Sequence, residues 1–243
     1  MSDPWIEIGC GPQVLALQTT CEPEPLPYGS FNLGLHVGDD KSSVIQNRAH
    51  LAARFGREVY FPEQVHGTNV VHVDADSPVI EADAVVTGQL HCPIGILTAD
   101  CLPVFFASKQ LVGAAHAGWR GLVSGVLERT LEEFTDPAEV SVWLGPCIGR
   151  DAFEVGPEVV DAFVSKNSSW SRYFQSVGDS DRSIADLQGI ARNLLENLGV
   201  VTIKSLEACT YSDSTCWYSY RRSGTTGRMA SCIMRTEQPV DNL

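Results

Sequence analysis

The sequence predicts a single α+β domain, and three observations support this fold class. Four segments carry apolar residues at helical spacing, short strand-like runs outnumber them, and the two kinds of element do not alternate regularly. The chain has 243 residues, 44% hydrophobic and 19% charged, which is enough to bury one large core. No repeat, low-complexity tract or linker divides it. We therefore predict one domain over residues 1–243.

The helices are predicted from apolar periodicity and from the signals at their ends. Serine and glycine flank the first segment, proline lies in the favoured first turn of the third, and Gly199 follows the fourth. The fourth has the clearest apolar stripe. The predicted helices are Ser42–Phe55, Leu122–Phe134, Pro157–Val164 and Ser183–Leu198.

Short apolar or β-branched runs bounded by Gly, Pro or Asp predict the strands. They are Val59–Phe61, Asn69–Asp74, Ala84–Val86, Ile94–Leu97, Pro103–Phe106, Leu111–His116, Val140–Leu144, Val200–Lys204, Thr215–Tyr220 and Met229–Met234. Their irregular order favours mixed sheets over a doubly wound parallel sheet. Near the N-terminus, Cys21–Tyr28 is predicted to be a proline-stiffened loop.

The charge and hydropathy of the chain argue against two classes of partner. With 17 basic and 30 acidic residues the net charge is −13, and no Lys/Arg cluster suits a nucleic acid. No run of 18 apolar residues predicts a membrane span, and the first residues, MSDPWIEIG, lack the basic charge of a signal peptide. We expect a cytoplasmic protein without nucleic-acid or membrane partners, in which a few placed arginines bind any anionic substrate.

Eight cysteines are scattered along the chain without a Cys-x-x-Cys pair. In a chain that can bury its own core and that lacks a leader, this favours free, mostly buried thiols over a disulfide framework. Cys147, in LGPCIG, fits that description.

Three potential metal ligands lie at predicted strand boundaries. His66 precedes a strand, Cys101 separates two apolar runs, and His116 ends another run. Their separations of 35 and 15 residues are unlike a zinc finger and fit a site assembled by the fold. Two imidazoles and one thiolate form a three-ligand zinc set with a fourth position for water. Gly118 and Gly121 predict a tight turn after His116.

Five groups of residues occur in order between Glu63 and Ser231: EQVHG, TADCLPV, HAGWRG, LGPCIG with AFEVG, and YSYRR with TGRMAS. With the segment Tyr28–Asp39 they resemble the bacterial laccase-domain, or polyphenol-oxidase-like, family over nearly the whole chain. The resemblance implies a four-layer α/β/β/α fold. It also implies a set of zinc ligands: His66, Cys101 and His116.

The activity implied by this resemblance is that of a zinc-dependent purine nucleoside phosphorylase. Its substrates would be adenosine, inosine, guanosine or methylthioadenosine together with inorganic phosphate, and adenosine deamination would be a second activity. Relatives usually carry an Arg-x-Gly-Gly loop where this chain reads TTCEPEPLPYGS. The resemblance therefore does not extend to a substrate contact from that loop.

Phosphate requires cationic groups, and arginines within the matched segments are the candidates. Arg120 is the first choice, with a catalytic role beside His116, because it lies next to a ligand and a predicted helix start. Arg48 lies on a predicted helix and could equally be a solvated side chain. Arg221 and Arg222 are adjacent, so only one could face the site from a strand.

Further polar residues are candidates for lining the substrate site. Asn32 and His36 occur in FNLGLH, and Asp83 occurs in EADAVV. Asn32 could equally close a turn, and Asp83 could simply begin a strand. Asp100 is a candidate for orienting His116 through a hydrogen bond.

Two other functions remain open from the sequence. Cys101 and His116 could form a metal-free cysteine hydrolase or amidase, for example one acting on a cell-wall precursor. A non-catalytic, zinc-stabilised binding protein would need a fourth ligand, for which His72, Cys147 and Cys209 are the candidates.

A multicopper oxidase is rejected because the chain has only six histidines, too few for a trinuclear cluster plus a blue-copper centre, although copper could bind adventitiously at the zinc site. The sequence does not fix the oligomeric state.

Overall fold

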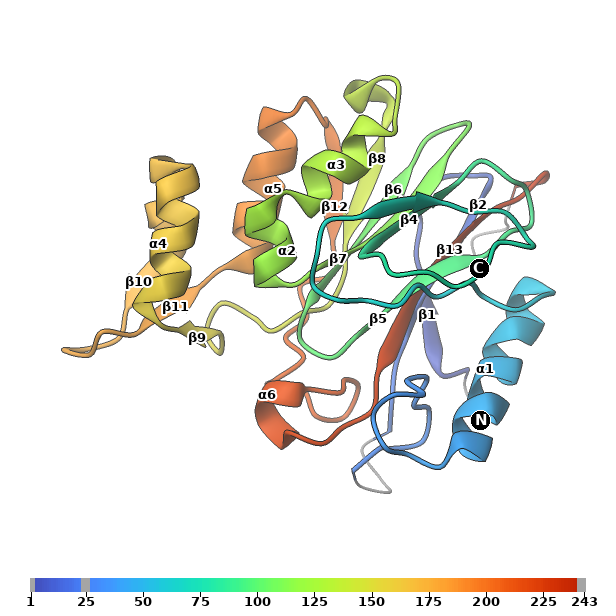
Figure 1. Ribbon diagram of the computed structural model, residues 1–243, viewed down its shortest axis with the longest axis horizontal. Coiled ribbons are helices and arrows are strands. Elements are labelled where there is room, and N and C mark those ends of the chain that lie inside the picture. The colour runs from blue at the N-terminus through green and yellow to red at the C-terminus, as the bar shows by residue number, and fades with distance from the viewer. Residues whose placement is uncertain (1–2, 23–26, 240–243) are drawn as a thin grey trace.

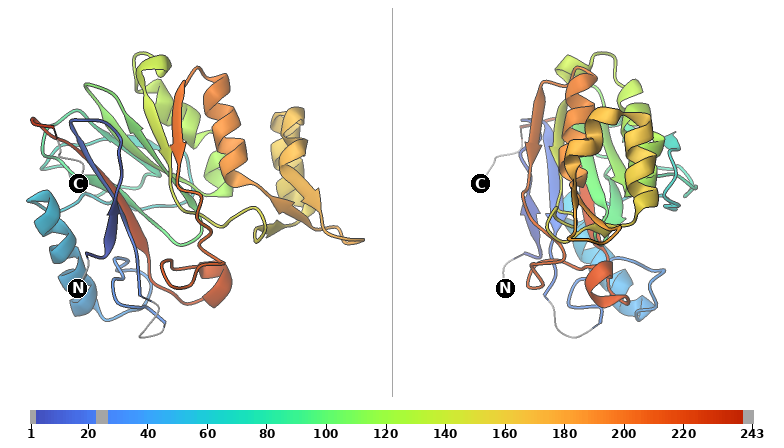
Figure 2. Two further views of the ribbon diagram at one scale, coloured as in Figure 1. Left: turned by 180° about the vertical axis from the view of Figure 1, so that it is seen from behind. Right: turned by 90° about the vertical axis from the view of Figure 1, so that its left-hand side faces the viewer.

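Helices and sheets form four layers in the computed structural model, which describes residues 3–22 and 27–239 (Figure 1). Helix α1 (Lys41–Phe55) covers one sheet, a second sheet packs behind the first, and α2 (Trp119–Ser124), α3 (Val126–Glu132) and α5 (Leu187–Asn197) cover the outer face of the second. The views in Figure 2 show the same succession of layers. The predicted α+β class with mixed sheets is confirmed.

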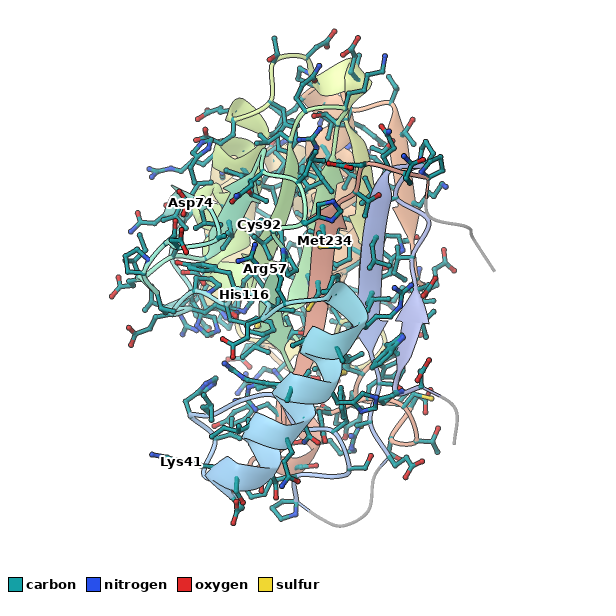
Figure 3. All side chains as sticks on the ribbon, turned by 90° about the vertical axis from the view of Figure 1, so that its right-hand side faces the viewer. Lys41, Arg57, Asp74, Cys92, His116 and Met234 are labelled. Atoms are coloured by element: carbon teal, nitrogen blue, oxygen red, sulfur yellow. The ribbon has the colours of Figure 1, made fainter. Side chains whose placement is uncertain are left out.

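The sheet beside α1 is entirely antiparallel, with the order β1-β2-β13-β5. Its strands are β1 (Trp5–Glu7), β2 (Val14–Thr19), β13 (Met229–Arg235) and β5 (Ile94–Thr98). Alternating residues of β13 face opposite layers: Met234 packs with Leu51 and Phe55 of α1, whereas Ile233 packs between the two sheets. Figure 3 shows Met234 on β13 and Lys41 at the start of α1.

The second sheet is mixed, with the order β12-β8-β6-β7-β4-β3. Its strands are β12 (Thr202–Ser205), β8 (Ser141–Leu144), β6 (Leu102–Ala107), β7 (Val112–Ala117), β4 (Ala84–Thr87) and β3 (Val70–His72). The edge pairs β12–β8 and β3–β4 are parallel, and the central pairs are antiparallel. Every residue of β6 and β7 is buried, which gives a site at their ends a rigid support.

One helix and three short strands form an arm beside the four layers (Figure 1). Three short antiparallel strands, β9 (Glu154–Val155), β10 (Phe174–Ser176) and β11 (Ser183–Ala185), lie with α4 (Pro157–Lys166). Short 3₁₀ helices span Pro137–Glu139 and Ser168–Tyr173, and α6 (Tyr220–Ser223) precedes β13. Among the described residues, no helix is both long and apolar enough to cross a bilayer.

Several predicted elements differ from the structure. The predicted helix Leu122–Phe134 is divided at Gly125, whose φ of 103° ends α2 before α3 begins. In Ser183–Leu198 the first three residues form β11, because Asp186 caps α5 by accepting a hydrogen bond from the Gly189 amide. Thr215–Tyr220 is not a strand.

In that third segment, Asp213 accepts hydrogen bonds from the backbone and hydroxyl of Thr215 and holds a turn. Ser219 then caps α6. The predicted strand Val59–Phe61 contributes only the isolated bridge of Tyr60 with Ile94. Residues 23–26 of the predicted N-terminal loop lie outside the described residues.

Candidate metal centre

The side chains of His66, Cys101 and His116 meet at one end of the central strands. Their potential ligand atoms all lie within 4.8 Å of one another, and Cys101 Sγ is 3.8 Å from His66 Nε2. His116 belongs to β7 and is buried, Cys101 directly precedes β6, and His66 lies in an exposed loop before β3. Figure 3 marks the position of His116 relative to α1 and β13. The fold thus brings together three residues that are distant in sequence.

The backbone at one ligand position, and directly before another, adopts the left-handed conformation that non-glycine residues rarely use. His66 has a φ of 62°, and Asp100, directly before Cys101, has a φ of 95°. Such strain persists only where surrounding contacts hold it, and it concentrates at functional sites. Asp100 is held by hydrogen bonds from the Thr210 hydroxyl at 2.6 Å and the Arg221 amide at 2.7 Å.

Asp83, and not Asp100, is the carboxylate that orients His116. Its Oδ1 lies 2.7 Å from Nδ1 of His116, which leaves Nε2 as the ring nitrogen that faces the cluster. The same carboxylate accepts hydrogen bonds from the backbone amides of Val65, His66 and Gly67 at 3.2, 2.9 and 2.6 Å. Asp83 is fully buried and has this positioning role in place of the substrate contact predicted for it.

Glycines keep the space around the cluster clear. A Cβ atom on Gly118 would lie 3.0 Å from both Cys101 Sγ and His66 Cδ2. A Cβ on Gly121 would lie 2.9 Å from the carbonyl oxygen of Gly67. The bare backbone after His116 therefore lets α2 begin in contact with the cluster and with the loop that carries His66.

The surroundings of Cys101 and His116 favour the ionised form of each side chain. Burial opposes ionisation of the Cys101 thiol, but the charge and hydrogen bond of His116 outweigh it and lower the pKa of the thiol to about 6. Burial also opposes protonation of His116, but Cys101 and Asp83 raise its pKa to about 9. A thiolate beside two imidazoles, one of them held by a carboxylate, is a donor set that suits zinc.

The predicted candidates for a fourth protein ligand do not join the cluster. His72 Nε2 instead pairs with Glu133 at 2.6 Å. Cys147 and Cys209 line a separate cavity of about 440 Å³ beside the N-terminus of α5. That cavity shares no lining residue with the three-ligand cluster, so we locate the site from its donor atoms rather than from cavity volume. Within the described part of the chain the cluster has three members, which fits an open coordination position.

The four candidate arginines have different surroundings. Arg120 is exposed, and its guanidinium stacks over the Trp119 ring with Cζ 4.4 Å from the centroid. Arg222 donates to the backbone carbonyls of Thr210, Tyr211 and Trp217 at 2.6, 2.9 and 2.7 Å, so it holds a loop.

Arg221 is exposed, donates to the Glu154 carbonyl at 3.0 Å and lies over Phe153. Both Arg221 and Arg222 are on α6 and not on a strand, which corrects the geometry predicted for them.

The segment that contains Asn32 and His36 meets α1 and the start of β13. Asn32 is buried; it accepts from the amides of Gly34 and Arg228 and donates to Asp39, so it closes a turn and is not free to bind substrate. Arg48 of α1 donates from Nε to the Leu33 carbonyl at 2.9 Å.

Arg228, in the segment TGRMAS, lies beside this turn but was not among the predicted site residues. The signal that could have identified it is a lone charge between Gly227 and the apolar run that begins at Met229.

Known proteins resemble this chain over most of its length. Residues 21–236 match the family described as multi-copper polyphenol oxidoreductase laccase. The purine nucleoside phosphorylase of Pseudomonas aeruginosa is 44% identical over 210 residues, covering 85% of this chain and 86% of that protein. The purine nucleoside phosphorylase YfiH of Escherichia coli is 43% identical over 213 residues, covering 85% and 87%.

A solved structure gives the same result for the fold. The crystal structure of a Neisseria meningitidis protein superposes with a TM-score of 0.91 at 38% identity, covering 96% of this chain and 100% of that one. The sequence match, the relatives and the shared four-layer fold lead to one conclusion: the chain belongs to the family of multi-copper polyphenol oxidoreductase laccases.

Proposed function

We propose that this protein is a zinc-dependent purine nucleoside phosphorylase. The observation that carries the proposal is the open cluster of His66, Cys101 and His116, in which a carboxylate orients one imidazole. The names of the relatives from Pseudomonas aeruginosa and Escherichia coli support the same reaction. Two imidazoles and a thiolate favour zinc, and copper at this position would be adventitious.

In phosphorolysis a phosphate oxygen bonds to the ribose C1′ as the bond from C1′ to the purine nitrogen breaks, and the electron pair leaves with the purine. A bound zinc ion would supply Lewis acidity at the cluster. Asp83 holds the imidazole of His116 in one orientation. Arg120, Arg48, Arg221 and His36 are the residues that we propose for substrate and phosphate contacts.

Adenosine, inosine, guanosine and methylthioadenosine are the proposed nucleosides, with adenosine deamination as a second activity of the same site. Eight cysteines that are all free in the structure support a reducing, cytoplasmic environment. The family description names a multicopper oxidase, but the six histidines of the chain are too few for that assignment.

The proposal is tested by metal analysis and product analysis of the purified protein. Zinc should be bound, and each nucleoside should yield its free base only when phosphate is present. The sugar product should be ribose 1-phosphate, or 5-methylthioribose 1-phosphate when the nucleoside is methylthioadenosine. Chelation should abolish the reaction and added zinc should restore it. Release of ammonia from adenosine without phosphate would measure the deaminase activity separately. Turnover that persists after complete chelation would contradict the zinc-dependent mechanism.

A metal-free cysteine hydrolase is the second candidate. In it Asp83 would orient His116, His116 would act as the base, and Cys101 would be the nucleophile. In that reaction His66 would have no essential role, and substrate would form a covalent adduct with Cys101. Activity of a His66→Ala variant together with such an adduct would favour this candidate over the phosphorylase.

A further inference from the structure

We propose that Arg228, together with Arg48 and His36, forms the subsite that binds inorganic phosphate. This inference rests on the proposed phosphorylase function and adds to it a residue, Arg228, and a location between the start of β13, helix α1 and the turn that precedes α1.

Two arginines from distant parts of the chain converge on this turn. The Arg228 amide donates to the Asn32 side chain at 2.8 Å, and the Leu33 amide donates to the Arg228 carbonyl at 3.1 Å. A Cβ atom on Gly34 would lie only 2.8 Å from Cγ of Arg228, so the arginine side chain runs directly over this glycine. Arg48 reaches the same turn from α1 through its bond to the Leu33 carbonyl.

Both guanidinium groups are half-buried, and the carboxylates that act on them, Glu58 on Arg48 and Asp100 on Arg228, lie beyond ion-pair distance. Among residues 3–22 and 27–239, neither Arg48 nor Arg228 forms an ion pair. Nη1 of Arg228 donates hydrogen bonds to the carbonyls of Thr226 and Gly227, and Nε of Arg48 donates one to the carbonyl of Leu33. The other donor atoms of both groups have no hydrogen-bond partner in the described chain. None of these nitrogen atoms is among the fully buried side-chain atoms without a partner, so they remain accessible to an incoming anion. An anion that accepts hydrogen bonds from both groups would gain two charged donors.

Arg228 lies near both His36 and the segment that leads to Cys101. Burial lowers the pKa of His36, and the positive charges of Arg228 and Arg48 lower it further, so both cations lie near this ring. Cζ of Arg228 lies 6.0 Å from the centroid of the Tyr220 ring, and the amide of the next residue, Arg221, donates to Asp100, which directly precedes Cys101. An anion held by Arg228 would therefore lie near the segment that carries Cys101, where phosphate could meet a nucleoside at the cluster.

Arg228 is better placed to bind an oxyanion than the other candidate arginines. A phosphate oxygen accepts the paired donors of a guanidinium in a planar arrangement that a lysine cannot provide. Arg222 is committed to three loop carbonyls, and Arg120 projects from the surface against its own neighbour Trp119. Arg228 is half-buried, preorganised by its backbone contacts and close to the cluster.

The test measures phosphate binding without nucleoside, by calorimetric titration of the zinc-loaded protein with inorganic phosphate. Arg228→Gln should weaken phosphate binding by about tenfold to a hundredfold, as expected for the loss of a charged hydrogen bond. Arg228→Lys should recover part of the affinity. Zinc content and melting temperature should stay at the wild-type values, which shows that the variants are folded.

Three further variants guard against an indirect effect. Gly34→Ala adds a methyl group that displaces the Arg228 side chain without removing its charge, and it should weaken phosphate binding as well. Gly9→Ala, where a Cβ meets nothing within 4 Å, should not change it. Arg150→Gln removes a guanidinium that is 72% exposed and lines the separate cavity, and it should also leave binding unchanged.

Each outcome is decisive for the subsite. The subsite is overturned if both Arg228→Gln and Gly34→Ala bind phosphate with unchanged affinity. It is also overturned if Arg150→Gln loses phosphate binding. Failure of the wild-type protein to bind phosphate overturns it too. If phosphate binds through Arg228 but no nucleoside is cleaved, the subsite stands and the phosphorylase proposal fails. If nucleosides are cleaved with an unchanged KM for phosphate in Arg228→Gln, the phosphorylase proposal stands and the subsite fails.

Discussion

The Asp83 carboxylate lies 2.7 Å from the ring of His116 and at the same time accepts the backbone amide of His66 at 2.9 Å. One buried side chain thus positions two of the three potential metal ligands by different means. It fixes the tautomer of His116 and the left-handed backbone of His66.

Asp83→Asn should lower zinc affinity by about tenfold to a hundredfold, because the amide cannot raise the basicity of the ligating imidazole as a carboxylate does and loses one acceptor for the loop amides. Competition with a chromophoric chelator measures the effect. Asp76→Asn, at a turn away from the cluster, should retain wild-type affinity. Equal zinc affinity in Asp83→Asn and wild type would refute the positioning role.

Gly118→Ala should reduce metal affinity while changing the melting temperature little. Its φ of −60° is acceptable for alanine, so the effect comes from the Cβ that would lie 3.0 Å from Cys101 Sγ and His66 Cδ2. Zinc titration and thermal unfolding of the same preparation separate the two effects. A variant with normal zinc binding would show that the cluster moves to make room.

Alkylation of Cys101 should depend on metal and on pH. Without metal the thiolate should react from about pH 6 upward, because His116 lowers the thiol pKa to that value. The lowered pKa of Cys101 adds stability progressively as the pH rises from about 6 to 9. The stability that comes from the raised pKa of His116 has the opposite dependence: it is complete below about pH 6.5 and is lost as the pH rises through about 9. Mass spectrometry after iodoacetamide treatment follows the reaction.

Bound zinc should suppress this alkylation, and Cys101→Ser should lose zinc and turnover together. Rapid alkylation of Cys101 in a protein that still contains its zinc would argue that the thiolate is not a ligand.

Arg120→Lys should raise the KM for phosphate and leave zinc content unchanged, because lysine keeps the charge but loses the planar pair of donors. Initial rates at fixed nucleoside and varied phosphate test this. If Arg228 supplies the principal contact, the defect in Arg120→Lys should be smaller than that in Arg228→Gln. Wild-type phosphate dependence would remove Arg120 from the site.

Arg222→Gln should destabilise the protein by about 2–3 kcal/mol, since it removes charged hydrogen bonds to three loop carbonyls. Denaturant unfolding measures the loss. Arg221→Gln, which removes one such bond from an exposed side chain, is the control and should cost less. If Arg221→Gln lost more unfolding free energy than Arg222→Gln, Arg221 and not Arg222 would be the residue that holds the loop.

Much of the fold could be predicted because periodicity and end signals are local. Helix α1 was predicted to within one residue of its start, with Gly56 at its end. The strands β9, β10 and β11 were not predicted as strands, since they are two or three residues long and are defined by pairing with distant partners. Strands β1 and β2 were also missed, and the break at Gly125 required knowledge of its φ.

The site shows the same limit. Sequence pattern and family resemblance singled out His66, Cys101 and His116, and the fold brings them together. Which carboxylate orients His116 could not be predicted, because Asp83 and Asp100 both lie at strand boundaries, and only the antiparallel pairing of β4 with β7 places Asp83 beside the imidazole. Arg228 was missed because its importance comes from a turn almost two hundred residues earlier in the chain.

The three potential ligands differ in how firmly the fold holds them. His116 ends a strand that is buried along its full length, whereas His66 lies on an exposed loop fixed by amide hydrogen bonds. Metal exchange should therefore follow an order: His66 dissociates first, and the pair of Cys101 and His116 retains the ion until the end. The loop that carries His66 would thus set how fast a bound metal ion is gained and lost.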